Sequence, residues 1–194
     1  MMKKLLVIGI AGFIGSGKST LGKFIEKSGG YFINADDIVD FLYMRGNAGY
    51  EKIKSFFGVE YLLKNGDLNR RKLAREVFSD KNKLRILNNL IHPMVVQEIK
   101  RKVSMIKSGV VALEAVYFEK GFLRDVVDKI IWVDCPKEVL MKRINKERKY
   151  DAGVLEKVLE LQKKPEKVDF VISNAGNKRD LLGKLKKIWP SLEK

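Results

Sequence analysis

The stretch "GIAGFIGSGKSTLGKF", residues Gly9–Phe24, decides the fold of this chain. Within it, "GFIGSGKS" from Gly12 to Ser19 matches the pattern G-x-x-x-x-G-K-[ST] at every fixed position. Glycines let the backbone turn so that its N–H groups surround a phosphate, and the helix that follows directs the positive end of its dipole at the same anion. An apolar run precedes the loop and a helical pattern follows it, which is the context that a phosphate-binding loop requires.

The loop predicts a protein that works on a nucleoside triphosphate. Lys18 is placed to reach the β- and γ-phosphates, and the Ser19 hydroxyl is a ligand for Mg²⁺. The motif alone does not separate a kinase from a GTPase or an ATPase motor. A motor needs more apparatus than this chain offers, and the guanine-specifying pattern N-K-x-D does not match "SNAG" at Ser173–Gly176. Small-molecule kinases are therefore the leading class.

Composition sets limits on where the protein works and what it binds. The chain has 194 residues, of which 45% are hydrophobic, enough for one compact domain. No apolar run approaches the about 20 residues that span a bilayer, and we read the apolar start as a strand rather than a signal peptide, so we expect a cytoplasmic protein. The single cysteine, Cys135, allows no internal disulfide.

The charge balance points to anionic partners. Lys and Arg number 39 against 24 Asp and Glu, giving a net charge of +15. Nucleic acid and small molecules with several phosphates both fit such a balance. However, no run of five or six like charges resembles a nucleic-acid arm.

Short Val- and Ile-rich runs alternate with longer amphipathic segments, a pattern typical of an α/β fold with a five-stranded parallel sheet. The predicted strands are Lys4–Ile10, Tyr31–Asn34, Val110–Glu114, Lys129–Asp134 and Asp169–Ile172. The predicted helices are Lys18–Lys27, Asp36–Arg45, one from Pro136, one over "GVLEKVLELQ" and Lys178–Ile188. Between Tyr50 and Lys107 we expect helices interrupted at Gly58, at the turn Lys64–Asp67 and at Pro93.

These elements suggest three regions. Residues 1–35, 108–135 and 168–194 would form the nucleotide-binding core, residues 36–107 a helical acceptor-binding insertion, and residues 136–167 a small helical lid. Both excursions leave from the carboxyl ends of strands, where open α/β sheets bind their ligands.

Two carboxylates follow the second predicted strand. A carboxylate at this position can accept the proton of an acceptor hydroxyl and help to hold Mg²⁺. The structural alternative is an N-cap for the next helix. We assign the functional role to Asp36 and the capping role to Asp37.

The ordered segments "GxxGxGKST", "INADDI", "GDLNRRKLAREVFSD", "LIHP", "YFE" and "WVDCP" resemble dephospho-CoA kinases over nearly the whole chain. The resemblance implies a P-loop NTPase fold, ATP and Mg²⁺ as cofactors, and transfer of the γ-phosphoryl group to the 3′-hydroxyl of dephospho-coenzyme A. "GDLNRRKLAREVFSD" and "LIHP" are more distinctive than the loop, since generic kinases of this fold lack them.

The resemblance also assigns residues. Asp36 would be the general base, with Lys18 and Arg143 as further catalytic residues and with Ser19 and Asp36 at the metal. The residues assigned to ATP are Gly12, Gly15, Ser16, Gly17, Lys18, Ser19, Thr20, Asn174 and Gly176. The residues assigned to the acceptor are Asp36, Asn69, Arg70, His92 and Glu114. His92 has a structural alternative, a bond to backbone where Pro93 breaks the helix.

Some positions depart from the family pattern. Asn34 replaces the first acid of D-A-D, and Glu114 replaces an aspartate but still ends a strand, as an acid that touches Mg²⁺ or its waters would. In the lid, Glu147 and Val158 stand where two further arginines are expected, with Arg148 and Lys157 beside them. A weaker phosphate clamp implies lower turnover, a shifted nucleotide preference or a different substrate.

Two alternatives therefore remain at this point. One is a P-loop kinase whose acceptor is a nucleotide or nucleoside. The other is a nucleic-acid-binding or regulatory P-loop protein, which the charge of +15 suggests although no RNA- or DNA-binding motif is present. Our expectation is dephospho-CoA as partner, no nucleic acid or membrane, and a monomer or weak oligomer.

Overall fold

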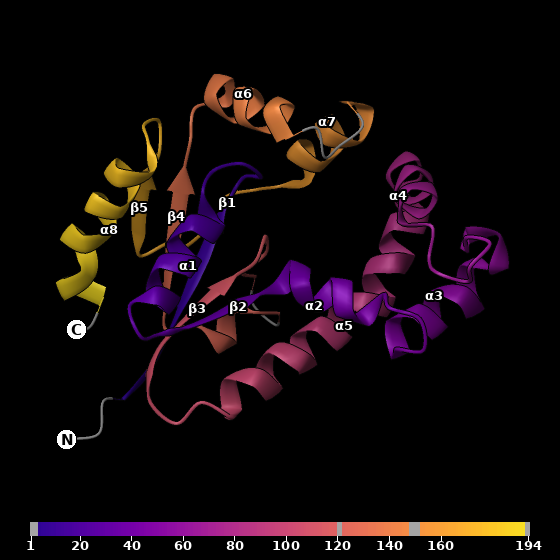
Figure 1. The fold of residues 1–194 in the computed structure, drawn as a ribbon, viewed down its shortest axis with the longest axis horizontal. Coiled ribbons are helices and arrows are strands. Elements are labelled where there is room, and N and C mark those ends of the chain that lie inside the picture. The colour runs from indigo at the N-terminus through magenta and orange to yellow at the C-terminus, as the bar shows by residue number, and fades with distance from the viewer. Residues whose placement is uncertain (1–3, 120–121, 148–151, 193–194) are drawn as a thin grey trace. The chain divides into compact units, whose positions relative to one another are not determined.

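The computed structural model describes residues 4–119, 122–147 and 152–192 (Figure 1). Within these residues, five parallel strands form one sheet in the order β2-β3-β1-β4-β5. The strands are β1 (Leu5–Gly12), β2 (Tyr31–Asn34), β3 (Gly109–Glu114), β4 (Lys129–Asp134) and β5 (Phe170–Ser173). The predicted α/β class with a five-stranded parallel sheet is confirmed.

The central strand carries the glycine loop. β1 pairs with β3 on one side and β4 on the other, so that Ile8 and Ile10 are fully buried. Parallel pairing places the carboxyl ends of the strands at one edge of the sheet. The loop after Gly12 and the last residue of β3, Glu114, therefore leave the sheet at this same edge, with Glu114 in register with Ile10.

Contacts divide the chain into two compact units, Met1–Asn34 with Lys102–Lys194, and Ala35–Arg101. The first unit holds the sheet, the helices α1 (Lys18–Lys27), α6 (Lys137–Glu147), α7 (Ala152–Leu161) and α8 (Lys178–Leu192), and a 3₁₀ turn at Arg124–Val126. Leu21 of α1 and Leu181 and Leu185 of α8 join one hydrophobic cluster with Ile8 and Ile10 of β1. This cluster fixes α1 and α8 against the central strand. Because α1 begins where the glycine loop ends, the cluster also fixes the end of the loop.

The second unit is helical, as expected from the sequence. It contains α2 (Ala35–Leu42), α3 (Ala48–Phe57), a 3₁₀ turn (Val59–Tyr61), α4 (Arg70–Ser79) and most of α5 (Lys81–Ser104).

The expected helix break at Pro93 is wrong, because α5 runs through it without interruption. Proline inside a helix removes one hydrogen bond and costs about 3 kcal/mol. The helix buries Leu87, Ile91, Val95 and Ile99, one residue every four positions on both sides of Pro93. At roughly 1.5–3 kcal/mol for each buried aliphatic side chain, this packing outweighs the cost of the proline.

Candidate active site

The glycine loop between β1 and α1 is held in a shape that only glycine permits at two positions. A Cβ atom on Gly12 would lie 2.6 Å from Val133 O and also 2.6 Å from Ser16 Oγ. Gly17 has a positive φ of 103°, and a Cβ there would lie 2.5 Å from Asn174 Nδ2. These glycines are therefore required by close approach and backbone conformation, as a phosphate-binding loop demands.

The loop opens directly into the N-terminus of α1. The amides of Thr20 and Leu21 donate to Gly17 O at 3.1 and 3.3 Å, which closes the first turn. The amides before them lie at a helix N-terminus, where N–H groups have no intrahelical acceptor and the helix dipole favours an anion. The geometry fits a phosphate group. Ser16 sits beneath this surface, with its side chain fully buried and its amide donating to Phe13 O at 3.0 Å.

Lys18, Ser19 and Glu114 meet at the carboxyl edge of the sheet. Ser19 Oγ donates to Glu114 Oε1 at 3.0 Å, and Lys18 Nζ lies 3.9 Å from the same oxygen. Lys18 Nζ also donates to Phe13 O at 3.1 Å. Mg²⁺ in nucleotide enzymes typically takes one or two protein oxygens together with substrate phosphates and water, and the hydroxyl and carboxylate here supply that number. The residues present therefore fit a Mg²⁺–nucleotide site.

Arg143 of α6, in the region predicted as a lid, contacts residues that the sequence predicted for ATP. Its guanidinium donates to Gly176 O at 2.9 Å, to Gly15 O at 3.3 Å and to Asn174 Oδ1 at 3.5 Å. Asn174 is buried and donates through Nδ2 to Ser16 O at 2.6 Å. The structure thus brings together four of the residues predicted for ATP with the predicted lid arginine.

The thiol of Cys135 lies beneath the same guanidinium. It donates to Asn174 O at 3.2 Å, with Arg143 Nη1 at 3.5 Å, and burial raises the pKa of this thiol. Of the two cations considered beside the missing lid arginines, Lys157 is exposed on α7 and Arg148 lies outside the described residues.

Sequence reasoning missed three residues that join the glycine loop to the region predicted as a lid. Phe13 and Ile14, at variable positions of the motif, pack against a cluster formed by Cys135, Leu140, Ile144 and Leu155. The side chain of Gln162, just past the end of α7, accepts a hydrogen bond from the Ile14 amide at 2.9 Å. The signal in the sequence was the pair of apolar residues inside a loop that otherwise consists of Gly, Ser and Lys.

In the helical unit, Asp36 and Asp37 both lie in the first turn of α2, and both are exposed. The expected capping role of Asp37 is wrong, because the helix already begins at Ala35. Both carboxylates instead face the positive end of the helix dipole from within the first turn.

Asn69 and Arg70 stand at the start of α4. Asn69 is the N-cap, its side chain accepting from the Lys72 amide at 3.1 Å. The Arg70 guanidinium pairs with the Asp40 carboxylate, donates to Asp40 O at 3.0 Å and lies 5.5 Å from the centre of the Tyr43 ring. Burial raises the pKa of Tyr43 to about 12, which keeps its hydroxyl protonated. The sequence analysis did not predict the contacts of Asp40 and Tyr43 with Arg70. The two residues lie four and seven positions after Asp36, a spacing that places them on the same side of a helix.

His92 is half-buried in the uninterrupted helix α5. Burial lowers the pKa of its imidazole from 6.5, so the ring is neutral at neutral pH. A neutral ring can accept one hydrogen bond and donate another.

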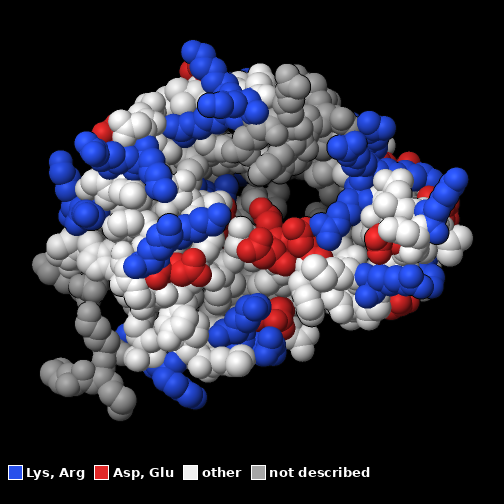
Figure 2. All heavy atoms as spheres, in the orientation of Figure 1, with Lys and Arg blue, Asp and Glu red and all other residues white. Residues whose placement is uncertain are grey.

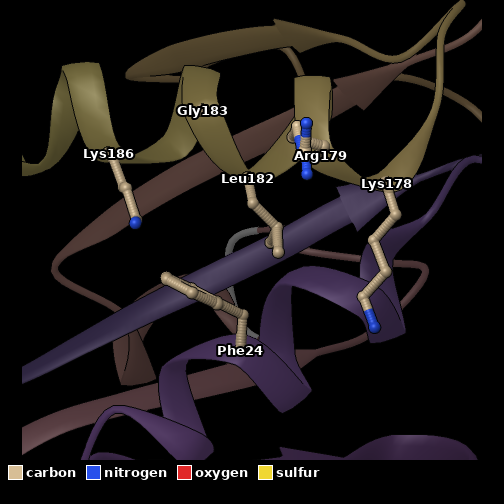
Figure 3. A pocket seen from close by; sticks show the side chains of 6 residues that line it. All are labelled: Phe24, Lys178, Arg179, Leu182, Gly183 and Lys186. Atoms are coloured by element: carbon tan, nitrogen blue, oxygen red, sulfur yellow. The ribbon is translucent and has the colours of Figure 1, made fainter.

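The surface shows no single basic band on the face seen in Figure 2, where Lys and Arg side chains are spread over most of the molecule. A shallow groove of about 540 Å³ lies between α1 and α8 (Figure 3). Phe24 and Leu182 form its apolar wall, and Lys178, Arg179 and Lys186 border it. None of the residues predicted for ATP or the acceptor lines it. Within the described part of the chain, each helix is too short or too polar to span a bilayer.

A glycine loop at the end of the central strand of a parallel sheet, with a lysine, a hydroxyl and a carboxylate at its mouth, is the nucleotide site of a P-loop protein. A shikimate kinase from Bacteroides thetaiotaomicron shares this fold, with a TM-score of 0.54 at 14% identity over 97% of this chain and 99% of that one. The family model for dephospho-CoA kinase matches residues 6–180, and the chain belongs to that family.

Individual relatives agree with this assignment. The chain is 33% identical to a dephospho-CoA kinase of Bacillus licheniformis, over 97% of this chain and 99% of that protein. It is 32% identical to a dephospho-CoA kinase of Aquifex aeolicus, over 95% of this chain and 96% of that protein. The solved dephospho-CoA kinase of Campylobacter jejuni matches with a TM-score of 0.64 at 26% identity, covering 96% of this chain and 98% of that one.

Proposed function

We propose that this protein transfers the γ-phosphoryl group of ATP to the ribose 3′-hydroxyl of dephospho-CoA, the final step of coenzyme A synthesis. The observation that carries the proposal is the cluster of Lys18, Ser19 and Glu114 at the mouth of the glycine loop, in a chain of this family. The cluster supplies a cation for the phosphates and two oxygens for a metal, within one hydrogen-bonded group.

The donor side of the reaction uses the sheet unit. The loop amides and the N-terminus of α1 bind the β- and γ-phosphates, and Lys18 turns from Phe13 O to the phosphates when ATP enters. Mg²⁺, held by Ser19 and by Glu114 directly or through water, would offset the charge that develops on the transferred group. Arg143 donates to Gly15, Asn174 and Gly176 and so orders the loops on either side of the nucleotide.

The acceptor side uses the helical unit. Asp36 is the general base that accepts the proton of the 3′-hydroxyl, and it is also the second candidate for a metal contact. Arg70 binds an acceptor phosphate, since a guanidinium fork suits that geometry. Asp40 and Tyr43 hold this fork in place, and Asn69 fixes the start of its helix. His92 binds the acceptor as a neutral hydrogen-bonding group.

The acceptor is tested by coupled detection of ADP release with a panel of dephospho-CoA, nucleosides and nucleoside monophosphates. We expect dephospho-CoA to give the highest kcat/KM by at least about tenfold, a difference of about 1.4 kcal/mol in transition-state binding. Inertness towards dephospho-CoA would refute the proposal. Activity on a nucleotide or nucleoside instead would support the second candidate, which the lid residues Glu147 and Val158 motivate.

The base is tested with Asp36→Asn against the matched control Asp37→Asn, one position along the same exposed helical turn. We expect Asp36→Asn to lower kcat by about 10²- to 10⁴-fold and to leave ATP binding unchanged. Near-normal turnover in this variant, or an equal loss in the control, would remove Asp36 from the base role.

The proposed setting is the cytoplasm, with the protein as a monomer or weak oligomer that needs neither nucleic acid nor a membrane. Sedimentation at several concentrations tests the oligomeric state, and salt-dependent binding to duplex DNA tests the nucleic-acid alternative.

A further inference from the structure

Two adjacent residues of the glycine loop, Ile14 and Gly15, make hydrogen bonds to the lid. One bonds through its amide and the other through its carbonyl. The Ile14 amide donates to Gln162 Oε1 at 2.9 Å, from just past the end of α7. The Gly15 carbonyl accepts from Arg143 Nη1 at 3.3 Å, from α6. The helical lid therefore holds the loop backbone directly at two points, from α6 and from just past the end of α7.

The side chains strengthen this attachment. Phe13 and Ile14 pack into the small hydrophobic cluster between α6, α7 and the end of β4, which includes Leu140, Ile144 and Leu155. A Cβ atom on Gly15 would lie only 3.1 Å from Ile144 Cγ1, so α6 approaches the loop closely. The lid and the loop share one core and are expected to move together.

Gln162 is a buried polar residue that is bonded to the backbone of Ile14. It is only 9% exposed, and it spans 148 residues of sequence to reach Ile14. A buried amide side chain is stable only when its polar atoms are hydrogen-bonded, and a buried N–H that loses its acceptor is costly. The bond directs the Ile14 N–H towards Gln162 and away from the phosphate-binding side of the loop, and the Ser16 amide donates to Phe13 O.

We propose that Gln162 is a positioning residue that holds the glycine loop in its ATP-receptive shape through the Ile14 amide, and so couples the lid to nucleotide affinity. Without the bond, the loop samples other shapes, and the dissociation constant for ATP rises in inverse proportion to the receptive fraction. The inference rests on the loop as the ATP site but does not depend on which acceptor is phosphorylated.

The test measures binding of Mg²⁺–ATP without acceptor by titration calorimetry, so that a wrong acceptor does not affect it. Gln162→Met keeps the length of the side chain and removes the acceptor oxygen. We expect the dissociation constant for ATP to rise about 5- to 30-fold, the loss that one buried hydrogen bond implies, with the KM for the acceptor unchanged. Gln97→Met, the same change at an exposed position of α5, is the matched control.

A purely structural role would lower thermal stability and the yield of active protein but leave the ATP dissociation constant of the folded fraction unchanged. An ATP affinity of Gln162→Met within twofold of the wild type would overturn the proposal, as would an equal loss in Gln97→Met. If Gln162→Met does not fold, hydrogen exchange on the wild-type protein decides. The Ile14 amide must be protected without nucleotide, and exchange at the rate of an open loop would refute the inference.

Discussion

The charge of Glu114 can be removed without changing its shape, by Glu114→Gln. The carboxylate is 5% exposed, accepts from Ser19 Oγ at 3.0 Å and lies 3.9 Å from Lys18 Nζ. At an effective dielectric constant of about 20, two unit charges at this distance attract by about 4 kcal/mol. The amide still accepts from Ser19 but no longer attracts Lys18.

Part of this attraction is offset, because burying the carboxylate costs several kcal/mol that the variant does not incur. Lys18 also keeps its hydrogen bond to Phe13 O. We therefore expect a net loss of about 2–3 kcal/mol in the free energy of unfolding. For a chain of this size, each kcal/mol moves the melting temperature by about 2–4 °C, so the expected fall is about 4–12 °C.

The assay is thermal unfolding at neutral pH without nucleotide, with Glu51→Gln on the exposed face of α3 as the control. Surface changes of this kind stay within about 0.5 kcal/mol. A double-mutant cycle with Lys18→Met should show a coupling energy of about 0.5–3 kcal/mol. A Glu114→Gln melting temperature equal to that of Glu51→Gln, or no coupling in the cycle, would refute the argument. In activity assays, the same variant should need more Mg²⁺ for half-maximal rate.

Three further outcomes follow from the site. Lys18→Ala should lower ATP-dependent turnover by on the order of 10²-fold or more, and near-normal turnover would contradict the phosphate-loop assignment. Tyr43→Leu should raise the KM for dephospho-CoA by about 2- to 5-fold with the KM for ATP unchanged, because the cation–π support of Arg70 is lost, whereas Tyr43→Phe keeps the ring and should be nearly neutral. His92 has a lowered pKa, so its unfolded form binds protons more readily, and the stability that the neutral ring contributes above pH 6.5 decreases as pH falls below that value. Urea unfolding between about pH 8 and pH 5.5 should therefore show a steeper acid loss for wild type than for His92→Gln, and parallel curves would contradict this.

The sheet and the glycine loop were predictable because each depends on local pattern. A parallel strand buried on both faces appears as a short Val- and Ile-rich run, and all five runs became strands. The phosphate loop requires glycine at fixed positions, so its sequence carries its conformation.

Pro93 was misread because propensity is local and packing is not. The free-energy cost of a proline inside a helix can be predicted from the sequence. The stabilisation that offsets it comes from the burial of Ile91 and Val95, and that burial becomes apparent only in the folded chain. Likewise, the bond between Ile14 and Gln162 joins residues 148 positions apart, and no periodicity links them. Asp40 and Tyr43 became relevant only when the folded chain placed Arg70 beside them.

The shared core of lid and loop changes how the divergent lid should be understood. If arginines at these two positions help to neutralise the phosphates, as we predicted from the resemblance, their replacement by Glu147 and Val158 lowers the rate of transfer. The contacts that order the glycine loop are different ones, made by Arg143, by Gln162 and by apolar packing, and they do not need those arginines. Divergence at the two positions therefore leaves the contacts that order the glycine loop in place, because those contacts come from other residues.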